Sequence, residues 1–177
     1  DTRCFVRGAP PVGFGGVRPR RYHVCAAFAS HRFLHPIVRD PRYPDHLKEN
    51  SRRIGQRSKR ISGILGEVKG IYFNETQGAF YNTIVFREGK LKPGQHLKIE
   101  NPKIKELVEG WVGIPGMQPD RRFVYYLLGA TGICVVPISS FCSDLMGFRV
   151  TLLEEDEQIL ENTFFRIKDA LEEYLNS

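Results

Sequence analysis

The segment that most constrains this chain runs from Gly129 to Leu153, where two apolar strand patterns enclose a single arginine. The first pattern, Ile133–Pro137, follows a helix that Gly129 and Gly132 are expected to end, and the second is Phe148–Leu153. Arg149 stands inside the second pattern. Because desolvating a guanidinium is costly, Arg149 is expected to meet a carboxylate or a phosphate. A substrate could supply that group, and a neighbouring Asp or Glu is the alternative.

Helical and strand patterns alternate along the chain from residue 45. Their periodicity predicts helices over 45–65, 101–110 and 119–128 and a closing helix whose first turn is the acidic Glu154–Glu157, with strands over 71–77, 79–86, 133–137 and 148–153. Gln77–Gly78 is interpreted as a bend or bulge, and Asn101–Pro102 as a helix start. This order predicts an α/β fold with a small, mainly antiparallel sheet of about four strands packed against helices.

The predicted helices each carry an apolar stripe that should face the core. Tyr125 and Tyr126 lie beside one stripe and are interpreted as packing residues. The stripes consist of Leu47, Ile54, Ile61, Ile64 and Leu65, then Phe123, Val124, Leu127 and Leu128, and finally Leu160, Phe164, Ile167, Leu171 and Tyr174.

Length and composition predict one ordinary domain. The 177 residues are 41% hydrophobic and 26% charged, and no apolar run is long enough to span a membrane, so a soluble, cytoplasmic protein without a membrane partner is expected. The start at Asp1 without methionine suggests a trimmed or partial chain. The net charge of +6 is unevenly spread, because residues 1–60 carry +10 and residues 61–177 carry −4. A basic front half is typical of nucleic-acid binding, although a solvated helix face explains its charges from Pro44 onward.

Two motifs resemble the carboxy-terminal domain of class I/II aminotransferases, which depend on pyridoxal phosphate. These are Gly-Ile-x-Val-Val-Pro-x-Ser-x-Phe at 132–141 and Phe-Arg-Val-Thr-Leu at 148–152. Gln77–Tyr81 resembles the family's Gly-Ala-x-Tyr strand start, and Arg53–Leu65 resembles its linker helix. The resemblance implies that residues 37–177 form the family's small domain. Residues 1–36, an irregular basic leader, have no counterpart in it.

The resemblance also implies roles for four residues. Arg149 stands where the family grips the α-carboxylate of its amino acid, for which the planar guanidinium is suited. Ser139 and Phe141 are expected to line the site, although Ile138 replaces the usual glycine and backbone capping by the serine hydroxyls is the alternative. Tyr81 resembles a position near the substrate side chain, but its place in a strand favours the core.

Neither a catalytic nor a cofactor-binding residue is identified in this chain. Transamination needs a Schiff-base lysine, an acid for the pyridine nitrogen and a phosphate cradle. Ser58–Lys59 is only superficially similar to the family's lysine motif, and Lys59 belongs to a charged helix face. The resemblance therefore implies an inactive fragment of a dimeric aminotransferase. The parent would bind pyridoxal phosphate, an amino acid and a 2-oxo acid, while this fragment would bind no cofactor.

The remaining motifs indicate no further site. Cys4, Cys25, Cys134 and Cys142 are scattered and expected to be reduced thiols. A zinc site at His23, Cys25, His31 and His35 is less favoured than ordinary histidines, so no metal is expected, and Gly13–Gly16 lacks the context of a phosphate loop.

Two alternatives stay open. A degenerate aminotransferase-like module could bind nucleic acid or a protein through the arginine-rich helix at Arg52–Arg60. The chain could also be an inactive remnant whose leader comes from a disrupted large domain.

Overall fold

A computed structural model describes residues 34 and 36–177. These described residues divide into two units, one that ends at Tyr43 and one that runs from Pro44 to Ser177. In the first unit, Arg42 forms an ion pair with Asp40 at 2.8 Å. The predicted division into 1–36 and 37–177 stays a prediction. The zinc and phosphate-loop hypotheses, together with Cys4, concern residues outside the described ones. No helix in the described ranges has the length and apolar character needed to cross a membrane.

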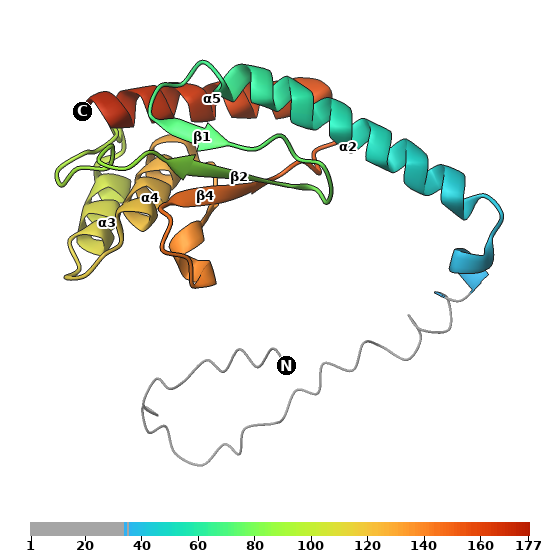
Figure 1. Ribbon diagram of the computed structural model, residues 1–177. Helices are drawn as coiled ribbons and strands as arrows, with labels where there is room; N and C mark the ends of the chain where they lie inside the picture. The colour runs from blue at the N-terminus through green and yellow to red at the C-terminus, as the bar shows by residue number, and fades with distance from the viewer. Residues whose placement is uncertain (1–33, 35) are drawn as a thin grey trace, which may run out of the picture. The chain divides into compact units, whose positions relative to one another are not determined.

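The second unit contains a four-stranded sheet, so the predicted α/β fold class is confirmed (Figure 1). All neighbouring strands are antiparallel, in the order β1-β2-β4-β3. On the central strand β4, Arg149 lies opposite Thr83 of β2 and Val136 of β3. The strands are β1 (Ile71–Phe73), β2 (Tyr81–Phe86), β3 (Val136–Pro137) and β4 (Gly147–Thr151).

The strands are shorter than the apolar patterns predict. β1 ends at Phe73, opposite Ile84, and residues 74–80 form the connection to β2. β3 begins only at Val136, although Val135 before it is buried. An apolar pattern reports burial, whereas a strand also needs a hydrogen-bonding partner beside it. The predicted strands were therefore correct in position and wrong in extent.

The helices follow the predicted order, with one short 3₁₀ turn, η1, added after β3. Asn101 caps its helix as predicted, because its side chain accepts hydrogen bonds from the backbone of Lys103 and Ile104. The predicted stop at Gly129 was wrong. A Cβ there would lie 2.8 Å from side-chain atoms of Ile99 and Val108, so this glycine lets two helices approach, and the helix ends at Gly132 with φ 75°. The elements are α2 (Tyr43–Leu65), α3 (Pro102–Val112), α4 (Pro119–Thr131), η1 (Ile138–Phe141) and α5 (Glu157–Asn176).

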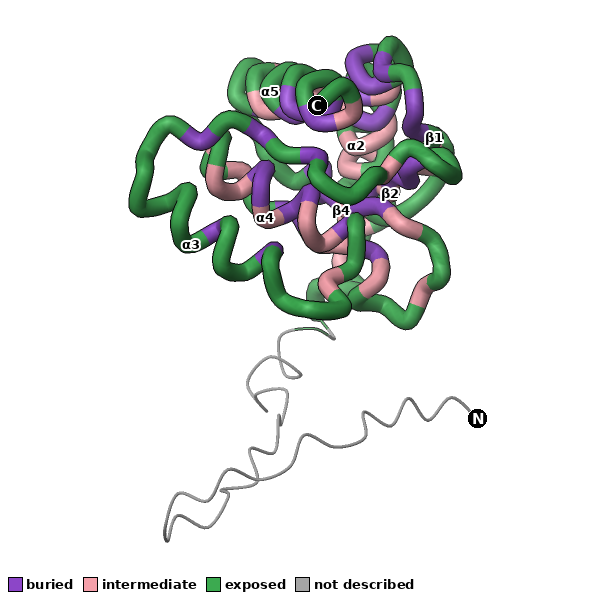
Figure 2. Tube along the Cα trace, turned by 90° about the vertical axis from the view of Figure 1, so that its left-hand side faces the viewer, coloured by how far each residue is buried: buried purple, intermediate pink, exposed green. Residues whose placement is uncertain are grey.

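The core lies between one face of the sheet and the helices, as the buried segments in Figure 2 show. The predicted α5 stripe is fully buried, and α4 buries Phe123, Val124, Tyr126 and Leu127. α2 and α5 lie side by side (Figures 1 and 2) and are joined by ion pairs from Arg60. The buried residues of α2 all lie between 58 and 65, so the prediction that Leu47 belongs to the core was wrong.

Tyr174 of α5 predicts a loss of stability at alkaline pH. Burial raises the pKa of this phenol from 10.0 to about 12, while the nearby Arg122 partly opposes the rise. The unfolded chain then ionises first, so this contribution is complete below pH 10 and is lost as the pH rises through about 12. The loss amounts to at most about 3 kcal/mol. Urea unfolding at increasing pH should show a falling midpoint. In Tyr174→Phe the urea midpoint should fall less over the same pH range. An equal fall of the midpoint in the variant and the original chain would contradict the prediction.

Candidate functional site

Strand alternation turns Arg149 away from the core. Its neighbours Phe148 and Val150 are buried on the core face, so the Arg149 side chain projects from the opposite face of the sheet. Thr83 pairs with Arg149 across the ladder, and Tyr81 lies two residues earlier on the same face of β2. Tyr81 is 42% exposed, so the interpretation of this residue as core was wrong. Its position instead places it beside Arg149.

Two aromatic rings flank the guanidinium of Arg149. Its Cζ atom lies 4.4 Å from the ring centroid of Phe141 and 5.4 Å from that of Tyr81. Phe141 comes from η1 and Tyr81 from the start of β2, so residues 60 positions apart in sequence converge on one side chain. Such cation–π contacts contribute roughly 0.5–1 kcal/mol each at partly exposed positions. These two contacts restrict the rotation of the guanidinium.

Arg149 has no acidic partner within the described ranges. It appears in none of the ion pairs there, and its Nε atom is buried without a hydrogen-bond partner among the protein atoms. A buried donor of a charged group is costly to leave unsatisfied. The alternative in which a neighbouring Asp or Glu neutralises this arginine is therefore not seen in the described part of the chain.

Ser139 is turned toward α4. Its hydroxyl donates to a carboxylate oxygen of Asp120 at 2.8 Å, and its backbone N–H donates to the other oxygen at 2.9 Å. Ile138, which replaces the family's glycine, is buried in this turn. A lining role for Ser139 and Phe141 remains a prediction. Sequence reasoning missed Asp120, because Pro119–Asp120 indicates only a helix start and nothing in the pattern links it to Ser139.

A hollow of about 310 Å³ lies at Arg149, between the segment that leads into β3 and the helix α5. Its walls are mainly apolar, and Glu154 contributes one carboxylate. No lysine is among its lining residues, and Lys59 lies exposed on α2, as predicted. The described residues therefore do not fit a pyridoxal phosphate site, since that cofactor needs a lysine amine and a phosphate cradle.

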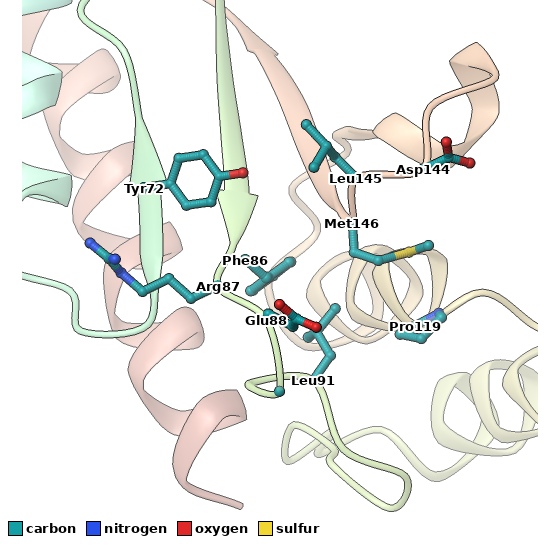
Figure 3. A pocket seen from close by; sticks show the side chains of 10 residues that line it. Tyr72, Phe86, Arg87, Glu88, Leu91, Pro119, Asp144, Leu145 and Met146 are labelled. Atoms are coloured by element: carbon teal, nitrogen blue, oxygen red, sulfur yellow. The ribbon is translucent and has the colours of Figure 1, made fainter.

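A larger hollow of about 610 Å³ lies at the other end of β2 and does not include Arg149. Figure 3 shows Tyr72, Leu145 and Met146 around it, with Glu88 and Leu91 from the segment after β2. Its charged residues, Arg87, Glu88 and Asp144, are all exposed and hydrated, so none of them requires a ligand. The smaller hollow is lined by Val150, Phe164 and Ile167 of the core side and by neither Phe141 nor Tyr81. The better candidate site is therefore the guanidinium of Arg149 with its two flanking rings on the opposite face of the sheet.

The arginines of α2 have partners within the chain. Arg52 and Arg53 both bind Glu49, and the side-chain hydrogen bond from Arg52, followed by that from Arg53, lowers the pKa of this carboxyl to about 2. Arg60 pairs with two acids of α5, and Arg57 donates to the backbone oxygen of Leu152. The ion pairs with Glu49 lie within α2, and the contacts of Arg60 and Arg57 link α2 to α5 and to Leu152. They offer no specific support for the nucleic-acid alternative.

Comparisons with known proteins link this fold to aminotransferases, although no protein-family model matches the chain. The chain is 38% identical over 154 residues to an uncharacterised aminotransferase of Methanocaldococcus jannaschii, a match that covers 87% of this chain and 35% of that protein. A probable mitochondrial alanine aminotransferase of Dictyostelium discoideum is 28% identical over 146 residues, which is 80% of this chain and 24% of that protein. The chain thus spans about a third or less of these relatives.

A solved structure supports the fold. The crystal structure of the aspartate aminotransferase from Rhizobium meliloti matches with a TM-score of 0.50 and 24% identity, over 73% of this chain and 28% of that one. The resemblance seen in the motifs is therefore confirmed: the chain is similar to aminotransferases over most of its length, and it has the fold and the share of their length expected of their carboxy-terminal small domain.

Proposed function

We propose that this chain is the small domain of a pyridoxal-phosphate aminotransferase and that Arg149 binds the α-carboxylate of the amino-acid substrate. The observation that carries the proposal is the Nε atom of Arg149, which is buried and without a partner among the described residues. A carboxylate would satisfy this donor and a terminal N–H of the same guanidinium at once, because the fork matches its two oxygens.

The chain's own residues would bind and orient the substrate. Phe141 and Tyr81 both contact the guanidinium, so little side-chain freedom would be lost when a carboxylate arrives. Pyridoxal phosphate would supply the electron sink for amino transfer when bound. Since the described residues do not fit a cofactor site, the lysine and phosphate cradle belong to other parts of the proposed parent. The proposal includes a homodimeric parent and an inactive domain when isolated.

Replacing Arg149 by lysine is expected to weaken carboxylate binding by roughly 1.5–3 kcal/mol, which corresponds to about 10- to 150-fold in affinity. Lysine keeps the charge but cannot present two parallel donors. The measurement is a titration of the 177-residue chain with L-alanine, followed through the backbone amide resonances of β2 and β4 by NMR.

The matched control for this titration is Arg87→Lys. Arg87 is exposed after the end of β2 and lines the other hollow, so its variant should bind L-alanine like the original chain. Equal affinity in the Arg149→Lys and Arg87→Lys variants would refute the carboxylate assignment. A catalytic test needs the longer parent enzyme, in which Arg149→Lys should raise the KM for the amino acid.

A further inference from the structure

We propose that Asp120 is a positioning residue for the carboxylate site. Its buried carboxylate holds the η1 turn and the start of β4 in the arrangement that keeps Phe141 stacked on Arg149. This inference rests on the carboxylate site proposed for Arg149 and adds a residue that lies outside that site. Sequence reasoning treated Asp120 only as part of a helix start.

The carboxylate of Asp120 binds three separate segments. Oδ1 accepts hydrogen bonds from the backbone N–H of Arg121 and from the hydroxyl of Ser139, both at 2.8 Å. Oδ2 accepts from the backbone N–H of Ser139 at 2.9 Å and, at 3.5 Å, from that of Gly147. Asp120 is 0% exposed and forms no ion pair within the described ranges. Its charge is therefore stabilised by these donors and by the amino-terminal end of α4.

The segments that Asp120 holds are those that carry the site. Ser139 precedes Phe141 by two residues within η1, and Gly147 precedes Arg149 by two residues within β4. One carboxylate thus accepts hydrogen bonds from both η1 and β4, the two elements that carry Phe141 and Arg149. The two hydrogen bonds from Ser139, at 2.8 and 2.9 Å, are short and charge-assisted, so they fix η1 on α4. The contact from Gly147 is longer, at 3.5 Å, and the ladder with β2 also holds this end of β4. The Asp120 anchor therefore sets chiefly the position of η1 relative to Arg149.

Phe141 depends on that anchor because packing alone does not hold its ring. The residue is 48% exposed, whereas Ile138 at the start of the same turn is buried. The position of the ring is therefore set by the backbone of η1. If the turn shifts, the 4.4 Å contact with Arg149 is lost and the guanidinium gains rotational freedom. Losing one cation–π contact should weaken carboxylate binding roughly two- to fivefold.

The test uses Asp120→Asn in the 177-residue chain and reads the side-chain Nε–H resonance of Arg149 by NMR. Asparagine keeps the shape, but whichever way its amide turns, the NH₂ group faces a backbone N–H of Arg121 or Ser139. The ring of Phe141, 4.4 Å from the guanidinium carbon, is expected to displace the Arg149 resonance in the original chain through its ring current. Asp120→Asn should remove most of that displacement, as Phe141→Leu does. The double variant should match Phe141→Leu alone, because both changes act through the same contact.

Two further variants keep the test decisive. Val108→Ala opens the core under α3, away from η1, and should leave the Arg149 resonance in place while lowering stability. Ser139→Ala removes only the hydroxyl donor and should move the resonance part of the way, which provides the answer if Asp120→Asn fails to fold. An unchanged resonance in folded Asp120→Asn, or in Ser139→Ala where Asp120→Asn is unfolded, would overturn the proposal. Additive shifts in the double variant would overturn it as well.

The same samples, titrated with L-alanine, separate this inference from the proposed function. If the resonance moves as expected but the original chain does not bind L-alanine, Asp120 positions the arginine and the carboxylate assignment fails. If L-alanine binds through Arg149 and Asp120→Asn changes neither the resonance nor the affinity, the carboxylate assignment stands and the positioning role is wrong.

Discussion

Replacing Gly147 by alanine should destabilise the fold by about 3 kcal/mol or more, since overpacking at a site that cannot relax is among the costlier single changes. A Cβ at this position would lie 2.1 Å from the backbone oxygen of Ile84 and 2.9 Å from the Cα of Val85. Both atoms belong to β2, which is paired with β4 at this point. The clash can be relieved only by opening the ladder between the two strands that form the centre of the sheet.

Urea unfolding followed by far-UV circular dichroism measures this loss as a lower midpoint. Gly110→Ala in α3 is the matched control, because nothing lies within 4 Å of its Cβ and the position is helical. That variant should be more stable than the original chain by about 0.5–1 kcal/mol, because glycine has a lower helix propensity than alanine. A Gly147→Ala midpoint at or above that of the original chain would show that the close approach of β2 and β4 is wrong.

Replacing Phe123 by alanine should cost about 3–5 kcal/mol, the range for a large aromatic removed from a rigid core. Phe123 is fully buried on α4, and its ring lies 5.2 Å from that of Phe86, 5.3 Å from that of Phe148 and 5.1 Å from that of Tyr174. One side chain thus joins α4, the sheet and α5. Because small domains are stable by only about 5–15 kcal/mol, the variant should be largely unfolded at moderate temperature.

The measurement for Phe123→Ala is thermal unfolding, combined with near-UV circular dichroism to report aromatic packing. Phe165→Ala is the control, since Phe165 is 47% exposed on α5 and its removal should change stability by no more than about 0.5 kcal/mol. Equal losses in the two variants would contradict the placement of the aromatic core.

The helices were predictable because their signals are local. The stripe from Leu160 to Tyr174 repeats at helical spacing, and Asn101 caps the following turn through its own side chain, so neither depends on distant residues. Strand lengths were less predictable. Val135 is as apolar and buried as a strand residue, yet the ladder begins at Val136, where β4 supplies a partner. Leu47 fits the helical stripe and yet is exposed, because the buried residues of α2 in the described part of the chain begin only at Ser58.

The candidate site, too, was predictable from the sequence only in part. Arg149 stood out in the sequence because a charged residue interrupts an apolar strand, which is a local contrast. Its lack of an acidic partner among the described residues, and the convergence of Phe141 and Tyr81 on it, depend on how η1 and β2 are placed around β4. Asp120 and Ser139 are 19 residues apart, and no spacing rule connects a helix start with the turn beyond the next strand.

The order of helices and strands, the buried faces of α4 and α5 and the presence of a cation within an apolar strand follow from the amino-acid sequence, because periodicity and capping act within a few residues. Tertiary structure alone decided which strands pair, where they stop, and which rings and carboxylate surround that cation. The reason is that hydrogen-bonding partners and burial come from segments distant in the chain, and only packing brings them within contact distance.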